Sequence, residues 1–277
     1  MPATAGEALQ AARDRLAAAS QTPRRDAEVL LAHVLCADQT ALLTHPERVL
    51  TAAESAQYEA FLVRRAASEP MQYITGVQEF YGLPFAVSPH VLIPRPETEH
   101  LVEAVLKRVS PQSQARILDV GTGSGAIAVS LAHALPRAQV TAIDLSSKAL
   151  EVARRNAETH GVSERITWVQ SDLLAAVTSL QFDVVVSNPP YIADREVLEP
   201  QVANYEPHTA LYAGPTGLEA YVRLIPQARK VLKPNGWLLL EIGFGQSPAI
   251  RKLLSDWTGV LFLSDLQGIR RVAVARR

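Results

Sequence analysis

The chain has 277 residues, of which 48% are hydrophobic and 20% are charged. These proportions are ordinary for a globular protein in water. The formal net charge of -1 argues against a general nucleic-acid binder. The single cysteine, Cys36, excludes an internal disulfide and a cysteine-based metal cluster, and its apolar neighbours predict a buried structural thiol. No apolar stretch approaches the roughly 18 residues that span a bilayer, and no signal-peptide pattern is present, so we expect a cytoplasmic protein.

Residues 1–70 are predicted to form a small helical domain. The apolar positions of its first helix recur at helical spacing, at Leu9, Ala12, Leu16 and Ala19. Thr22 and Pro23 predict the N-cap and the first position of a second helix. Thr51 and Glu54 have the spacing of a capping box at the start of another. The segment contains no catalytic constellation.

Residues 71–96 change character and are predicted to form a β-hairpin connector. Residues that favour strands, among them Tyr73, Ile74 and Phe85, are interrupted here by glycines and a proline. Three further prolines, at 89, 94 and 96, stiffen the entry to a helix that we expect from Pro96 to about Arg108.

Residues 97–277 are predicted to form one α/β domain, in which strands alternate with helices. Expected strands cover 115–120, 139–143, 166–170, 182–187 and 237–242, and expected helices cover 126–135, 147–160 and 217–232. The last of these helices contains Pro226, where we expect a break or kink. Such alternation predicts a mostly parallel, doubly wound sheet. Two final strands, near 259–264 and 270–275, predict an antiparallel edge.

A glycine-rich loop follows the strand that ends at Val120. The loop consists of Gly121, Thr122, Gly123, Ser124 and Gly125, and a helix is expected after it. Ligands of open α/β sheets bind beyond the carboxyl ends of the strands, where glycines let the backbone come close to a cofactor. Asp144 ends the next predicted strand, and its carboxylate can accept hydrogen bonds from both hydroxyls of a ribose. A tight turn without a ligand is the alternative.

The spacing of the loop disfavours a nicotinamide dinucleotide. The dinucleotide fingerprint has its third glycine three residues after the second, but here Ala126 occupies that position. Asp119, just before the loop, suits a cationic cofactor such as a sulfonium better than a pyrophosphate, or it anchors the loop. After the third strand, Asp172 and Leu173 are expected beside an adenine ring. A helix N-cap is the alternative for Asp172.

The residues that carry the chemistry are expected to be Asn188, Pro189, Pro190 and Tyr191, which follow the strand 182–187. An amide or aniline-like nitrogen is a poor nucleophile because its lone pair is delocalised. The Asn188 carboxamide oxygen and the Pro189 carbonyl can accept hydrogen bonds from its two N–H groups, and Tyr191 can stack on its planar group. Positioning for in-line attack supplies much of the acceleration, so neither a strong base nor a metal is required. A simple chain reversal is the alternative.

With these motifs, the chain resembles the protein-(glutamine) methyltransferases of the PrmC/HemK family over nearly its whole length. Further matching motifs are Gln78–Phe85, Val91–Glu99, Glu206-Pro207 and Ala210-Leu211. The resemblance implies a Rossmann-like class I methyltransferase domain and an N-terminal helical domain that grips the substrate. It implies transfer of a methyl group from S-adenosyl-L-methionine to the glutamine of the Gly-Gly-Gln motif in class I peptide chain release factors. By position, Gly121–Gly125, Asp144, Leu173 and Asn188 would bind the cofactor, and Asn188–Tyr191 would hold the glutamine. Leu173 departs from members that have an aromatic residue beside the adenine.

Three rival functions remain open. A nucleic-acid amino-methyltransferase faces the same local problem, but it has to unstack its base and usually has a basic substrate face. An inactive protein-binding scaffold is disfavoured by the intact tetrad. A sister family that methylates glutamine in a ribosomal protein is separated only weakly, through the segment 92–99. The oligomeric state expected is a monomer.

Overall fold

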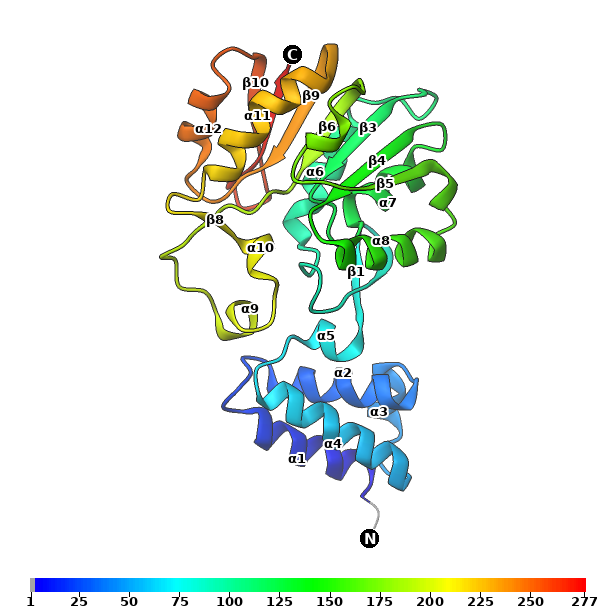
Figure 1. Cartoon of the computed structure of the whole chain (residues 1–277). Coiled ribbons are helices and arrows are strands. Elements are labelled where there is room, and N and C mark those ends of the chain that lie inside the picture. The colour runs from blue at the N-terminus through cyan, green and yellow to red at the C-terminus, as the bar shows by residue number, and fades with distance from the viewer. Residues whose placement is uncertain (1–2) are drawn as a thin grey trace. The chain divides into compact units, whose positions relative to one another are not determined.

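The computed structural model describes residues 3–277, which form two compact units (Figure 1). The first unit contains the described residues up to Gly76 together with Leu198–Tyr205, and the second contains Val77–Val197 and Glu206–Arg277. These units are cut differently from the three predicted segments, because residues 198–205, expected in the methyltransferase domain, pack with the helical unit. The division into a gripping domain, a connector and a catalytic domain remains a functional prediction.

The first unit is a helical bundle, as the spacing of its apolar residues indicates. Its elements are α1 (Ala5–Leu16), α2 (Pro23–Leu35), α3 (Gln39–Thr44), α4 (Ala52–Ala66), α5 (Met71–Thr75) and the short α9 (Pro200–Ala203). The predicted capping box at α4 is confirmed, since Glu54 N–H donates to Thr51 Oγ1 over 3.2 Å and Thr51 N–H donates to Glu54 Oε2 over 2.8 Å. Thr22 lies at the N-cap of α2 but makes no side-chain cap bond.

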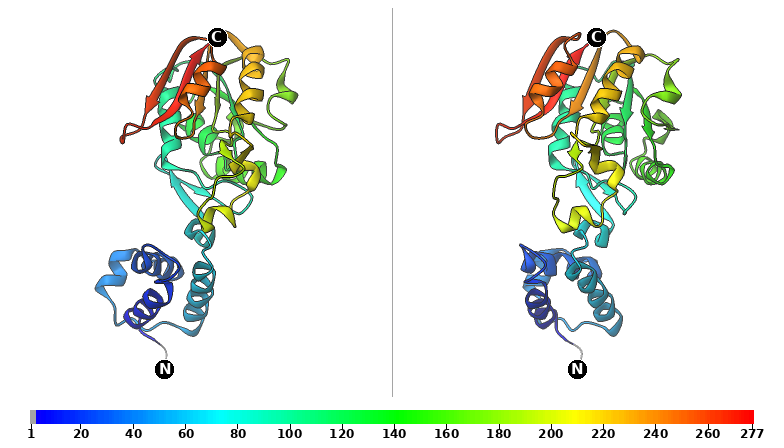
Figure 2. Two further views of the ribbon diagram at one scale, coloured as in Figure 1. Left: turned by 90° about the vertical axis from the view of Figure 1, so that its left-hand side faces the viewer. Right: turned by 60° about the vertical axis from the view of Figure 1, so that its left-hand side comes forward.

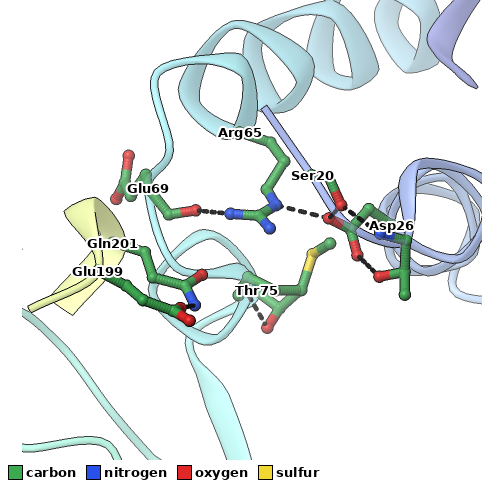
Figure 3. A network of polar contacts seen from close by, with 9 residues as sticks. Ser20, Asp26, Arg65, Glu69, Thr75, Glu199 and Gln201 are labelled. Atoms are coloured by element: carbon green, nitrogen blue, oxygen red, sulfur yellow. Dashed lines mark hydrogen bonds and ion pairs between the residues drawn. The ribbon is translucent and has the colours of Figure 1, made fainter. Parts of the chain in front are cut away.

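A polar cluster surrounds Asp26, and Figure 3 labels Ser20, Asp26, Arg65 and Glu69 in it. The exposed Thr22 belongs to this cluster through its hydroxyl. The Asp26 carboxylate accepts hydrogen bonds from Ser20 Oγ over 2.7 Å and Thr22 Oγ1 over 3.2 Å. It also forms an ion pair with Arg65, whose Nε lies 2.7 Å from Asp26 Oδ2. A second guanidinium nitrogen of Arg65 donates to the Glu69 carbonyl over 2.9 Å. This cluster joins α2 to α4 through a buried charge on each helix.

Two sequence predictions for this unit are wrong. Tyr73 and Ile74 lie in α5 rather than in a strand, because Gly76 ends that short helix in a left-handed conformation and Ile74 packs into the apolar core of the bundle. Burial against the bundle has therefore outweighed the strand preference of these residues. Cys36 is exposed rather than buried, because it is the left-handed C-cap of α2, with φ of 48°.

The segment 198–205 joins the first unit through α9 and Tyr205. The Tyr205 hydroxyl donates to the carbonyl of Ala67 over 2.8 Å. Within the segment, Gln201 Nε2 donates to Glu199 Oε2 over 2.9 Å, and both side chains are drawn in Figure 3. The chain thus leaves the second unit soon after the tetrad and returns to it at Glu206.

The second unit is built on a seven-stranded sheet of order β10-β11-β9-β6-β3-β4-β5. The strands are β3 (Arg116–Val120), β4 (Gln139–Asp144), β5 (Ile166–Gln170), β6 (Phe182–Ser187), β9 (Leu232–Glu241), β10 (Thr258–Ser264) and β11 (Arg270–Arg276). The five strands from β9 to β5 are parallel, whereas β11 pairs antiparallel with both β9 and β10. Figure 2 shows this final hairpin, in red and dark orange, at one edge of the sheet. The predicted doubly wound α/β fold with an antiparallel edge is confirmed.

Helices cover both faces of the sheet because successive strand residues point to opposite sides. Ile117 packs with α6 (Glu99–Leu106), α7 (Ala126–Ala134) and the end of α8 (Ser147–Thr159). The next residue, Leu118, packs with α11 (Glu219–Val231) and α12 (Ser247–Leu253) on the other side. Helix α11 continues through Pro226, so the expected break is wrong, whereas the kink stays a prediction.

Short elements connect these layers. They are β1 (Val77–Phe80), β2 (Leu83–Ala86), β7 (Ile192–Ala193), β8 (Tyr212–Gly214), α10 (His208–Leu211) and the 3-10 turns η1 (Pro96–Thr98), η2 (Ser163–Arg165) and η3 (Ala175–Val177). The strands β1 and β2 form the predicted hairpin. Within residues 3–277, no helix is both long and apolar enough to cross a bilayer. The same residues contain no group of three or more His, Cys, Asp or Glu side chains able to hold a metal ion.

Candidate active site

The neighbouring parallel strands β6, β3, β4 and β5 bring the predicted site residues to one edge of the sheet. Val120 is in register with Ile143 on one side and with Ser187 on the other. Ser187 in turn is in register with Leu240 of β9. The segments that follow these strands therefore meet at the carboxyl edge, where open α/β sheets bind ligands.

A cavity of about 500 Å³ opens at this edge, within the size range of small-molecule sites. Seven of the predicted residues line it, namely Gly121, Gly123, Asp144, Asp172, Leu173, Asn188 and Pro190. Other parts of its wall come from residues 90–92, from Pro207 to Ala213, and from the start of α11.

The glycine loop lines the cavity with Gly121 and Gly123. The N–H groups of Gly121 and Thr122 both donate to the Ile143 carbonyl over 2.9 Å, which ties the loop to the end of β4. Gly121 and Gly123 have φ values of 73° and 56°, and a Cβ on either would meet no atom within 4 Å. A side chain at these positions would thus project into open space at the cavity.

The other three loop residues build the turn and are not among the residues that line the cavity. Gly125 has φ of 81°, and a Cβ there would lie 3.0 Å from the Cβ of Ala153 in α8. The Ser124 carbonyl accepts a hydrogen bond from Asn156 Nδ2 over 2.8 Å. The Thr122 hydroxyl donates to Asp119 Oδ2 over 2.6 Å. Their direct contact with a cofactor remains a prediction.

Asp119 is fully buried beneath the loop. Its Oδ1 finds no hydrogen-bond partner among residues 3–277. Burial raises the pKa of Asp119 to about 7, and the Thr122 hydrogen bond only partly opposes this. These contacts favour the loop-anchor alternative over direct contact of Asp119 with a cofactor.

Asp144 is held by the backbone while it lines the cavity. Its Oδ2 accepts from Gly123 N–H and its Oδ1 from Ser146 N–H, both over 2.9 Å. Burial raises the pKa of Asp144, and these two N–H groups oppose the shift. Each carboxylate oxygen keeps further lone pairs, so the side chain is fixed in orientation and can still accept from a ligand.

Asp172 and Leu173 lie on the cavity wall after β5. The Asp172 carboxylate forms an exposed ion pair with Arg223 over 2.6 Å. It does not cap the following turn, since Ala176 N–H donates to Ser171 Oγ instead. Leu173 has φ of 49°, an unfavourable conformation for a residue with a side chain. Such strain clusters at ligand sites, in keeping with the adenine contact that remains a prediction.

The tetrad follows β6 directly. Asn188 Nδ2 donates to Thr98 Oγ1 over 3.0 Å, whereas Asn188 Oδ1 accepts no hydrogen bond from the described residues. Pro189 is buried and Tyr191 is half-buried, and neither is among the residues that line the cavity. The Tyr191 carbonyl accepts from Gln246 Nε2 over 3.0 Å. The stacking role of Tyr191 and the acceptor role of Pro189 remain predictions.

A buried carboxyl behind the tetrad escaped sequence analysis. Glu241 ends β9, and its Oε2 accepts from the Thr98 hydroxyl over 2.6 Å. The Tyr191 hydroxyl lies 3.5 Å from Glu241 Oε1. Burial raises the pKa of Glu241 to about 7. The available signal was an acidic residue after the apolar run 238–240, at the carboxyl end of a predicted parallel strand.

A second buried carboxyl, Glu206, holds the segment that precedes η1. Its Oε2 accepts from Ile93 N–H over 3.1 Å, and its Oε1 lies 2.5 Å from a guanidinium nitrogen of Arg95. Residues 90–92, just before Ile93, and Pro207, just after Glu206, line the cavity. The two sequence motifs around Ile93 and Glu206 therefore shape one wall of it.

Two family models match the chain. Residues 7–76 match the PrmC N-terminal domain, and residues 97–204 match the methyltransferase small domain.

Curated proteins match it over nearly their full length. The release factor glutamine methyltransferases of Koribacter versatilis and Moorella thermoacetica are each 47% identical to it. The first match covers 94% of both chains and the second covers 99% of both. The release factor glutamine methyltransferase of Escherichia coli is 42% identical over 93% of this chain and 94% of its own.

Solved structures support the fold. The hMettl16 catalytic domain, in complex with a MAT2A 3'UTR hairpin, superposes with a TM-score of 0.56 at 18% identity, covering 88% of this chain and 90% of its own. The Thermus thermophilus 16S rRNA methyltransferase RsmC, with AdoMet and guanosine, gives a TM-score of 0.54 at 21% identity. That match covers 73% of this chain and 49% of RsmC. At these identities the likeness concerns the methyltransferase fold alone.

Proposed function

The chain belongs to the release factor glutamine methyltransferases, and we propose that it methylates the glutamine of the Gly-Gly-Gln motif in class I peptide chain release factors. The methyl donor is S-adenosyl-L-methionine, and the acceptor is the side-chain amide nitrogen. The observation that carries this proposal is the identity of 42–47% to proteins of that name over more than nine-tenths of both chains.

The cavity fits this cofactor on grounds of its own chemistry. Gly121 and Gly123 leave open space where side chains would otherwise project. Asp144 presents a carboxylate whose orientation is already fixed by two backbone N–H groups, and ribose hydroxyls are suitable donors to it. Leu173 supplies an apolar surface beside it for a planar ring. These residues, with Asn188, would hold the cofactor.

Bound S-adenosylmethionine supplies an electrophilic methyl group on a sulfonium. The chain's own contribution is orientation of the acceptor. Asn188 Oδ1 and the Pro189 carbonyl would accept from the two N–H groups of the glutamine amide, and Tyr191 would pack against its plane. Pro190 restricts the backbone of the tetrad. Fixing the amide nitrogen in line with the methyl group removes much of the entropic barrier. The leaving group would be the neutral thioether of the demethylated cofactor. The methylated nitrogen would be acidic and would give its proton to water, so the proposal requires no strong base.

The proposal also covers the partner and the place of action. The first unit would grip the release factor, the enzyme would act as a monomer in the cytoplasm, and it would make no direct contact with nucleic acid. The net charge of -1 supports a protein substrate. Methylation of a ribosomal-protein glutamine or of a nucleic-acid amine remains the alternative to exclude.

A transfer assay with radiolabelled cofactor tests the proposal. A release factor, the same factor with its motif glutamine replaced by alanine, a ribosomal-protein fraction and nucleic acid are offered side by side. We expect label only in the unaltered release factor. Label in the glutamine-free factor or only in nucleic acid would overturn the proposal.

The Asn188→Ala variant tests the mechanism in the same assay. We expect turnover to fall by roughly 10³-fold, as for other groups that act mainly in the transition state. The dissociation constant of the cofactor, measured by calorimetry, should change by less than about threefold, because most of the predicted contacts remain. Unchanged turnover would contradict the assigned role of Asn188.

A further inference from the structure

The end of β9 lies beside the tetrad because of the register of the sheet. Ser187 of β6 pairs with Leu240 of β9, so the next residues along the two strands, Asn188 and Glu241, are also neighbours. Thr98, at the end of η1, lies between their side chains. Its hydroxyl is 2.6 Å from Glu241 Oε2 and 3.0 Å from Asn188 Nδ2.

When Glu241 is ionised, the chemistry of these three groups allows only one direction for the hydrogen bonds. An ionised carboxylate can only accept, so the Thr98 hydroxyl has to donate its single proton to Glu241. Its remaining lone pairs can then only accept, and Asn188 has to present its NH₂ group to them. The carboxamide oxygen of Asn188 is thereby left for the cavity side, where no described residue donates to it.

We infer that Glu241 and Thr98 are positioning residues that fix the polarity of the Asn188 side-chain amide, so that its oxygen rather than its nitrogen meets the substrate. This inference rests on the proposed function, in which that oxygen accepts from the glutamine amide. With the amide reversed, Asn188 would direct N–H donors at the N–H donors of the substrate. The same reversal would direct its oxygen at the lone pairs of Thr98.

Burial makes the arrangement strict. Thr98 is 4% exposed and Glu241 is 2% exposed, so water has little access to substitute for a missing donor. Tyr221 fixes the end of β9 further, because its hydroxyl donates to the Glu241 carbonyl over 2.8 Å. The contact of the Tyr191 hydroxyl with Glu241 Oε1, at 3.5 Å, is at the limit of a hydrogen bond. The same carboxyl is thus connected to two members of the tetrad.

The orientation of the Asn188 amide should depend on pH. When Glu241 is protonated, it can donate a hydrogen bond to Thr98, and the Thr98 hydroxyl is then free to donate to Asn188. Burial raises the pKa of Glu241 to about 7, and hydrogen bonding to Thr98 opposes this. The other titratable or charged groups that face Glu241 are Glu97, Arg271, Tyr191 and Tyr221.

The test uses the full-length enzyme with a release factor and radiolabelled cofactor. Thr98→Val keeps the shape of the side chain but removes the hydroxyl, and we expect kcat to fall by about 10- to 100-fold, as when a catalytic group is slightly misplaced. Thr98→Ser restores the hydroxyl and should recover kcat to within about threefold of wild type. The dissociation constant of the cofactor should stay within about twofold for both variants, since neither change touches Asp144 or the glycine loop.

A matched control is Ser130→Ala. Ser130 is a buried hydroxyl of α7 in the same unit, 1% exposed, and it has no hydrogen-bond partner among the described residues. Its loss should leave kcat unchanged. Far-ultraviolet circular dichroism and the cofactor affinity verify that each variant is folded.

The pH profile separates positioning from simple packing. For the wild type, kcat should rise with pH through about 7 as Glu241 becomes a carboxylate. The Glu241→Gln variant should have lower kcat above pH 7 and should lose this rise. A Thr98→Val variant with full turnover, or a Glu241→Gln variant that keeps the wild-type profile, would overturn the inference. Failure of the wild-type enzyme to label any release factor would instead count against the proposed function.

Discussion

Asp26 of the helical unit and Glu241 of the catalytic unit are buried in opposite ways, although the catalytic unit also contains a buried carboxylate that is paired with a cation, Glu206 with Arg95. In the helical unit, Asp26 is paired with Arg65 and with two hydroxyl donors, so its charge is balanced within the cluster. In the catalytic unit, Glu241 is met by the hydroxyls of Thr98 and Tyr191 and is hydrogen-bonded to no cation. Asp119 of the same unit has one hydroxyl donor and one oxygen without a partner.

The difference separates two purposes that a buried charge can serve. A paired charge such as Asp26 joins helices and is costly to break, but it offers nothing to a ligand. A carboxyl without a cation is costly to keep ionised, and its pKa rises accordingly. When ionised, such a carboxyl can only accept hydrogen bonds, so it determines which neighbouring atoms donate. This property suits a catalytic site. Three carboxylates test this contrast.

The largest expected effect is on the stability of the helical unit. Asp26→Ala leaves Arg65 buried without its partner, which should destabilise the unit by about 3–5 kcal/mol. Hydrogen exchange of amides in α2 and α4 measures the free energy of local opening. Glu59→Ala is the control, because its ion pair with Arg15 joins α1 and α4 at the surface, with side chains 38% and 59% exposed. That change should cost less than about 1 kcal/mol, and equal effects of the two variants would refute the contrast.

An intermediate effect is expected from the pH dependence of stability at Glu241. Its pKa rises from 4.5 to about 7 on folding, so the folded state binds the proton more tightly. The stability that this proton provides is fully present below pH 4.5 and is lost as pH rises through 7. The loss is on the order of 3 kcal/mol. Relative to wild type, Glu241→Gln should gain stability by that order between pH 5 and pH 8, as measured by urea unfolding. A constant difference across this range would show that Glu241 does not titrate there.

The smallest expected effect concerns Asp144, whose carboxylate serves a ligand directly. Asp144→Ala removes a charged acceptor and should weaken cofactor binding by about 10- to 100-fold, measured by calorimetry. Asp172→Ala alters another carboxylate on the same wall, but one that is 54% exposed and already paired with Arg223. We expect less than about fivefold from this control. Equal losses would mean that Asp144 has no special contact with the cofactor.

Local patterns were enough to predict most of the second unit. The predicted strand 166–170 has the same bounds as β5, and the predicted bounds of β3, β4 and β6 agree with the observed ones within a residue. These bounds could be predicted because hydrophobic alternation and turn residues act over short distances. Asp144 and Asn188 could be located for the same reason, since Asp144 ends a recognisable strand and Asn188 directly follows one. Tyr73 and Ile74 were misassigned because packing on the bundle, rather than intrinsic preference, decides their structure.

Contacts between distant positions could not be predicted in this way. Thr98 lies 90 positions from Asn188 and 143 positions from Glu241, and no local pattern marks them as partners. The packing of residues 198–205 with the helices is likewise a tertiary contact, made by Tyr205 to a carbonyl 138 positions away. Sequence reasoning thus located side chains that line the cavity, but not those that hold them in place.

Because residues 198–205 belong to the helical unit, cleavage of the chain at one place cannot separate the two units completely. The chain passes between them at three places, after Gly76, after Val197 and after Tyr205. Cleavage after Gly76 would separate the helices from residues 198–205, which would stay attached to the catalytic unit. Tyr205 would then lose the Ala67 carbonyl that accepts its hydrogen bond. A truncated enzyme that begins at Val77 would therefore retain residues 198–205 without the helices they pack against. This segment begins within ten residues of the tetrad. The helical unit is therefore not a module that can be detached, because it contains a segment from the middle of the chain.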